Sequence, residues 1–224
     1  MFTSMILDKM KIEIENYLEQ EKRWPQEGRH ILAQYDDESI IVYQAYRKAI
    51  ANYALKHGRF GGPFSFERMT WIKPNFLWMM YRSGWGTKNG QEYVLAIRLK
   101  RSFFNRILSE AVKSSYADYL GYSHEIWKEK IAASSVRLQW DPDHEPGYGK
   151  LERKAIQIGM RNDVVKEYVN DAILEIININ DFVEEQRENN LKDKYKNLMT
   201  PKEKIYYPGD KAAQNVGLSK MENL

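Results

Sequence analysis

Residues 68–88 read Arg68-Met-Thr-Trp-Ile-Lys-Pro-Asn-Phe-Leu-Trp-Met-Met-Tyr-Arg-Ser-Gly-Trp-Gly-Thr-Lys88, and the strongest structural signals of the chain lie in this stretch. A proline forces the residue before it into an extended conformation and suits the first turn of a helix. We therefore predict a strand over residues 69–73, a helix over residues 74–83, and a stop at Gly84. The first amide groups of such a helix are unpaired, so the strand-to-helix junction is expected to attract an anion.

Aromatic and basic side chains alternate in the same stretch. Rings stack on flat groups and cations neutralise phosphate, so this combination favours a flat, negatively charged ligand. The residues concerned are Trp71, Trp78 and Trp85 with Arg68, Lys73, Arg82 and Lys88. The competing interpretation, which we prefer for four apolar residues of the stretch including Trp71, is that they fill the core, as such residue types usually do: Trp71, Phe76, Leu77 and Met80.

Composition narrows the function classes. The chain of 224 residues has 34 basic and 31 acidic residues and no cysteine. Disulfides, thiolate zinc sites and a cysteine nucleophile are thereby excluded, and the four histidines lack metal-ligand spacing, so no metal site is expected. The near balance of charge favours a local basic site over a generally basic surface. No apolar run approaches about 18 residues and the start is charged too early for a signal peptide, so we expect a cytoplasmic protein without membrane contact.

Strands and helices are mixed without regular alternation, which indicates an α+β fold with a mixed or split β-sheet and flanking helices. Asp- and Pro-rich residues 141–147 predict a loop. We expect one α+β domain over residues 1–182 and a charged, helical, partly mobile tail over residues 183–224. The further predicted strands are 28–35, 93–99, 136–140, 155–160 and 173–179, and the further predicted helices are 38–57, 103–113 and 163–169.

Polar side chains occur in predicted strands where apolar ones would suit a sheet better. They are Arg29, Thr70, Lys73, Gln139 and Gln157. One amide in a sheet is commonly a satisfied structural group. Several on separate strands favour a lined cleft, because buried polar groups cost free energy unless they have partners.

Long segments resemble the family described as domain of unknown function 4291. They include Arg-His-Ile-Leu-Ala-Gln-Tyr-Asp-Asp from residue 29, all of residues 68–88, Gln-Trp-Asp-Pro-Asp at residues 139–143 and Arg-Lys-Ala-Ile-Gln-Ile-Gly at residues 153–159. The resemblance covers about residues 29–179. It implies no activity.

The order of elements is also distantly similar to that of ADP-ribosyltransferases that modify nucleic acid. In these enzymes a basic residue of the first strand holds the cofactor NAD, aromatic residues stack on its nicotinamide, and a glutamate of a late strand orients the acceptor. The resemblance implies the first role for Arg29. It implies the second for Tyr35, Tyr43 or Tyr81.

Gln157 stands where the glutamate is expected. A neutral amide cannot stabilise a cationic sugar or accept a proton as a carboxylate can. Either Asp141 or Glu152 supplies the carboxylate, or the chain is a binding protein on a transferase scaffold.

The leading hypothesis is an ADP-ribosyltransferase-like protein that binds NAD or a related nucleotide in a basic and aromatic cleft and transfers ADP-ribose to a nucleic acid or nucleotide. The alternatives are a noncatalytic nucleic-acid or nucleotide-binding module, whose rings and cations hold a single strand, and a scaffold whose tail binds a partner. The acceptor, turnover and the oligomeric state stay open. The catalytic residues would be Gln157, Arg68 and Asp141, and the cofactor-binding residues Arg29, Gln34, Tyr35, Tyr43, Lys73, Trp78, Tyr81 and Arg82.

Overall fold

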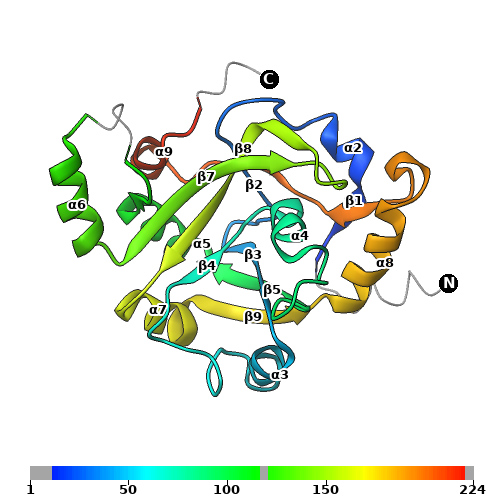
Figure 1. Ribbon diagram of the computed structural model, residues 1–224, viewed down its shortest axis with the longest axis horizontal. Helices are drawn as coiled ribbons and strands as arrows, with labels where there is room; N and C mark the ends of the chain where they lie inside the picture. The colour runs from blue at the N-terminus through cyan, green and yellow to red at the C-terminus, as the bar shows by residue number, and fades with distance from the viewer. Residues whose placement is uncertain (1–11, 117–120, 220–224) are drawn as a thin grey trace.

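The computed structural model describes residues 12–116 and 121–219, in which α-helices surround several small β-sheets (Figure 1). The class is therefore α+β, and the strands are divided among separate sheets, as predicted.

The largest described sheet has four strands in the order β4-β8-β7-β6. β8 runs antiparallel to both β4 and β7, and β6 pairs parallel to β7. The loop predicted over residues 141–147 is wrong in its first half, because pairing with β8 continues past a register shift between Pro142 and His144. The strands are β4 (Thr70–Ile72), β6 (Val112–Lys113), β7 (Val136–His144) and β8 (Lys150–Met160).

A second sheet has three antiparallel strands in the order β3-β5-β9. The helix predicted over residues 38–57 is wrong in its first half, where β3 precedes a shorter helix, α3. The run Ile40-Ile-Val-Tyr43 is buried on both faces, with alternate side chains in different apolar clusters, which is typical of a central strand. The elements are β3 (Ser39–Tyr46), α3 (Lys48–His57), β5 (Tyr93–Lys100) and β9 (Ile173–Asn178).

A backbone bridge joins the two sheets. Tyr43 of β3 donates its amide to the carbonyl of Lys73, just after β4, and accepts the Lys73 amide, with N–O distances of 2.7 and 3.2 Å. The helix α4 (Phe76–Ser83) follows and packs between β3 and β7 (Figure 1). It ends at Gly84 in a left-handed conformation, φ 60°, as predicted, but begins later than expected because Asn75 is its N-cap.

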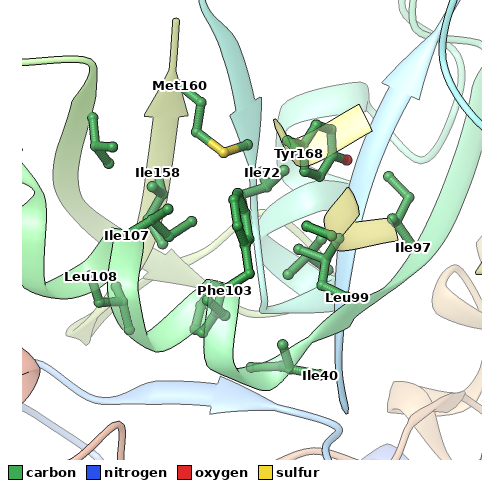
Figure 2. Packing of buried hydrophobic residues seen from close by; sticks show 14 of the residues in the cluster. Ile40, Ile72, Ile97, Leu99, Phe103, Ile107, Leu108, Ile158, Met160 and Tyr168 are labelled. Carbon is green, nitrogen blue, oxygen red and sulfur yellow. The ribbon is translucent and has the colours of Figure 1, made fainter. Parts of the chain in front are cut away.

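The main apolar core lies between the sheets and α5 (Arg101–Glu110). Figure 2 shows Phe103, Ile107 and Leu108 of α5 against Ile158 and Met160 of β8. A second cluster surrounds α4 and includes Phe182 and Val183 of α8 (Asn180–Asn190). The helix predicted over residues 103–113 is wrong at its end, since residues 112–113 form β6.

The chain after residue 182 pairs with the N-terminal strands. β10 (Met199–Pro201) lies antiparallel to β1 (Ile14–Asn16), and β11 (Lys204–Tyr206) lies antiparallel to β2 (Ile31–Ala33). The helix α9 (Asp210–Val216) packs on α5, and Tyr206 is fully buried. The remaining helical elements are α2 (Tyr17–Glu21), α6 (His124–Ala133), α7 (Asp163–Glu167), a π-helix (Tyr168–Ala172) and a 3₁₀ helix (Asp193–Tyr195).

Candidate functional site

One face of the β7–β8 pair carries polar side chains. Successive side chains of a strand point to opposite faces, so Leu138 and Ile158 enter the core while Gln139 and Gln157, which are paired across the strands, face away from it. Both amides donate to Asp141, at 2.8 Å from Gln139 Nε2 to Oδ1 and 2.9 Å from Gln157 Nε2 to Oδ2. The Asp141 carboxylate is therefore held by one donor on each oxygen.

These three side chains line a hollow of about 360 Å³, which we call the site hollow. The other wall comes from β4, α4 and the junction between them. A carboxylate, two cations and two indole rings thus share one small space. The lining residues are Trp71, Lys73, Trp78, Arg82, Gln139, Asp141 and Gln157.

Lys73 lies at the point where the two sheets meet, and only 7% of it is exposed. Burial and, to a smaller extent, the charge of Arg82 lower the pKa of its amine to about 8, against the opposing effect of Asp141. A strand that ends at residue 73 would leave Lys73 at the rim of the junction. The bridge to Tyr43 instead holds it inside, facing the polar surface of β7 and β8.

A wider hollow of about 710 Å³, which we call the arginine hollow, adjoins the site hollow and shares Trp71, Lys73 and Arg82 with it. Its walls include two further cations, Arg47 and Arg68, both exposed. A long ligand can therefore extend from the carboxylate of β7 to a row of guanidinium groups.

Trp71 corrects an expectation. We assigned it to the core, but it is half-buried and lines both hollows, because its neighbours Thr70 and Ile72 occupy the buried face of β4. Its ring lies across Gly159 of β8, the residue paired with it. A Cβ at Gly159 would come within 2.9 Å of the indole carbons, so the absence of a side chain at this position makes room for the ring.

The start of α4 is occupied by side chains of the chain itself, so the anion site predicted there is already filled. Asn75 accepts the Trp78 amide at 2.6 Å, and Glu203, in the connection between β10 and β11, accepts the Phe76 amide at 2.7 Å. Glu203 is buried, and burial raises the pKa of its carboxyl well above the usual range. Sequence reasoning missed this residue, because it lies in the segment expected to be a tail.

A buried ion pair lies near Glu203. Arg153 Nε donates to Asp143 Oδ2 at 2.6 Å, and both side chains are almost fully buried. The guanidinium group also lies over the Trp24 ring, with 5.2 Å between its carbon and the ring centroid. Arg153 and Gln157 are on the same face of β8, four residues apart, so the ion pair supports the strand that carries the site amide.

The structure brings together six of the predicted site residues. Lys73, Trp78, Arg82, Asp141 and Gln157 line the site hollow, and Arg68 lines the arginine hollow. Gln139, which we noted only as a polar strand residue, belongs with them. The sequence pattern that indicates Gln139 as a site residue is the spacing Gln139-x-Asp141, which places two polar side chains on one face of a strand.

Five predicted residues lie elsewhere. Arg29 bridges to Lys154 through its backbone, and its guanidinium lies 3.5 Å from the position of a Cβ at Gly217, near α9. Gln34 and Tyr35 donate to backbone carbonyls near β11. None of these three residues lines the site hollow or the arginine hollow.

The remaining two are Tyr43 and Tyr81. Tyr43 is fully buried in the cluster around α4. Tyr81 is stacked on His144, with 3.5 Å between ring centroids, and on Trp78 at 5.3 Å. Tyr81 therefore contacts the site through Trp78. His144 stacks on both rings, and burial lowers the pKa of its imidazole.

Two findings concern other classes of site. Across residues 12–116 and 121–219, no cluster of three or more His, Asp or Glu side chains is arranged to hold a metal ion. Among the helices in those residues, none has the length and apolar character needed to cross a membrane.

The chain matches a known protein family. Residues 30–206 match the family described as Domain of unknown function (DUF4291), which confirms that resemblance over most of the chain's 224 residues. The matched range contains every residue that lines the site hollow. A search of curated proteins found no match.

Proposed function

The chain belongs to the family described as domain of unknown function DUF4291, and we propose that it binds NAD or a related nucleotide in the site hollow and acts as an ADP-ribosyltransferase-like protein. The relationship to the ADP-ribosyltransferase fold is part of this proposal. The arrangement of charges and rings in the two hollows supports the proposal.

The cations are placed for a pyrophosphate. Lys73 and Arg82 line both hollows, and Arg68 lines the wider one, so a ligand that spans them meets positive charge along its length. Guanidinium groups bind phosphate oxygens in pairs, while a lysine acts as a point charge. The half-buried indole ring of Trp71 offers a flat surface for a base or a nicotinamide, while the buried Trp78 forms part of the wall behind it.

Asp141 takes the role that the resemblance gives to a glutamate at position 157. When nicotinamide leaves, it keeps the bonding electrons and the ribosyl carbon becomes cationic. A carboxylate stabilises this cation and accepts the proton of the attacking acceptor group. Gln157 and Gln139 each donate to one oxygen of Asp141, which fixes the carboxylate in one orientation.

The single observation that carries the proposal is the presence of Asp141, held by two amides, in the same hollow as Lys73 and Arg82. A carboxylate opposite two cations suits a ligand with a negative phosphate at one end and a developing positive charge at the other. The acceptor in the proposed reaction is a nucleic acid or nucleotide, because the arginine hollow is open and lined by exposed cations.

Incubation with NAD tests the proposal, with nicotinamide release as the measure of turnover and a shift of the melting temperature as the measure of binding. Release that depends on Asp141 supports a transferase. A thermal shift without release supports a nucleotide-binding protein. If NAD causes neither nicotinamide release nor a thermal shift, that result counts against the proposal as a whole.

The second candidate is a noncatalytic nucleic-acid-binding module. The observation that favours it is the row of exposed arginines, Arg47, Arg68 and Arg82, along the arginine hollow. Binding of single-stranded DNA or RNA through such contacts weakens steeply with added salt. Affinity that stays flat between low and high salt excludes this candidate.

A further inference from the structure

Lys73 is a largely buried lysine at the junction of the two sheets. Only 7% of the residue is exposed, yet it lines both hollows. Within residues 12–116 and 121–219, no hydrogen bond or ion pair of its Nζ atom is found. The nitrogen is not one of the fully buried atoms that lack a partner, so it keeps access to the open space of the hollows.

Lysines in this situation are chemically distinctive. An amine is activated as a nucleophile when it is desolvated or placed beside another cation, because both conditions favour its neutral form. Lys73 meets both conditions. Burial is the main cause of its lowered pKa and the neighbouring Arg82 charge is the next. A neutral primary amine of this kind attacks carbonyl carbons.

We propose that the Lys73 amine forms an imine with the aldehyde group of a phosphorylated sugar that occupies the two hollows. The amine nitrogen adds to the carbonyl carbon and gives a carbinolamine. The carbinolamine hydroxyl is then protonated and leaves as water while the C=N bond forms. One water is released, and no oxidant or reductant takes part.

The surroundings of Lys73 supply the other groups that this step needs. Asp141 lines the same hollow and acts on the charge of Lys73, so it can carry a proton between the amine and the departing hydroxyl. Arg82 borders both hollows and Arg68 the wider one, which places guanidinium groups where they can hold the phosphate.

This inference goes beyond the proposed function, since it requires neither NAD nor transfer of ADP-ribose. The two ideas use the two protonation states of one side chain. Protonated Lys73 neutralises a phosphate, while neutral Lys73 attacks an aldehyde. The activity can therefore be tested in the absence of NAD.

The experiment is reductive trapping. The full-length protein is incubated with ribose 5-phosphate and sodium cyanoborohydride, which reduces an imine to a stable amine, and modified lysines are mapped by peptide mass spectrometry. We expect Lys73 to be modified at least about tenfold faster than the exposed Lys88, because its lower pKa leaves more neutral amine. Ribose without phosphate is expected to modify Lys73 more slowly.

Two matched variants complete the test. Lys73→Arg is expected to abolish the fast adduct and Lys88→Arg to leave it unchanged, with folding checked by circular dichroism. Modification of Lys73 no faster than that of Lys88 in the folded wild-type protein overturns the inference, whatever the variants show. Fast modification of Lys73 in a protein that shows no thermal shift with NAD supports the inference and counts against the proposed function alone.

Discussion

Gln157 donates a hydrogen bond to Asp141 from one strand of the β7–β8 pair to the other, with 2.9 Å between Nε2 and Oδ2. In the proposed function, the amide at position 157 therefore does not replace the acid. It positions the acid that is present. This relationship separates the role of the charge from the role of its orientation, and the two can be tested by different substitutions.

Asp141→Asn removes the charge while keeping the size of the side chain. Loss of one electrostatic group in an active site typically lowers the rate about 100- to 1,000-fold, so nicotinamide release should fall by that factor. NAD affinity should change little, because the phosphate-binding cations remain. The assay compares kcat and Kd of the variant with those of Glu152→Gln, the matched control on β8. Equal turnover in wild type and Asp141→Asn contradicts the role given to Asp141.

Gly159→Ala should move the Trp71 ring. The new methyl group would come within 2.9 Å of two indole carbons and 2.7 Å of Met69 Sδ, so the ring must shift. Overpacking of this kind costs about 1–3 kcal/mol of stability. NAD affinity should fall as well, since the ring lines the site hollow. Urea unfolding and calorimetric titration measure the two effects, and NAD affinity equal to that of wild type contradicts the contribution of Trp71.

NAD affinity should fall as the pH rises through the pKa of Lys73, which burial lowers to about 8. A bound phosphate stabilises the protonated amine, so binding raises its pKa, and the affinity gained from the charge is complete below pH 8 and lost above it. Titrations between about pH 7 and pH 9 in wild type and Lys73→Met measure this effect. The variant should bind more weakly at the lower pH and show no such fall. If the NAD affinity of Lys73→Met falls with pH in the same way, the pH dependence comes from another group.

Arg153→Met should destabilise the protein strongly. The substitution leaves the buried Asp143 carboxylate without its cation, and removal of one partner of a buried pair costs about 3–5 kcal/mol. The matched control is Arg23→Met. Arg23 forms an equally short pair with Glu15 at the surface, 2.5 Å, but exposed pairs contribute at most about 1 kcal/mol. Urea unfolding of both variants measures the difference, and equal losses contradict the importance of burial.

Glu203 should make the protein less stable as the pH rises. Burial raises the pKa of its carboxyl in the folded state, so the folded protein keeps a proton that the unfolded chain loses above about pH 4.3. Glu203→Gln mimics the protonated form and still accepts the Phe76 amide. The variant should gain stability relative to wild type as the pH rises. A difference that is constant from about pH 4 to pH 8 contradicts a raised pKa.

Local chemistry made part of the fold predictable. Gly84 ended α4 because a left-handed residue suits a helix stop, and the β5 strand was read correctly from its β-branched and apolar run. The β3 strand was misread as a helix. Its apolar run fits either element, and only the two flanking apolar clusters, built from distant parts of the chain, make it a central strand.

The site was predictable where polar residues stood in strands that face the same space. Lys73 and Gln157 met this condition and line one hollow. Arg29 did not, because the direction of its side chain depends on the bridge to Lys154 and on contacts near α9, which no local pattern shows. The role of Glu203 at the start of α4 depends on a contact across 127 residues.

The decisive measurement is a crystal structure of the protein soaked with NAD. We expect ligand density between Trp71, Lys73 and Asp141, with the pyrophosphate toward Arg82 and Arg68. Two results would contradict a nucleotide site at the junction of the two sheets. In the first, this space stays unoccupied at saturating NAD. In the second, NAD binds only in the separate hollow beside α9 that is lined by His30 and Gln214.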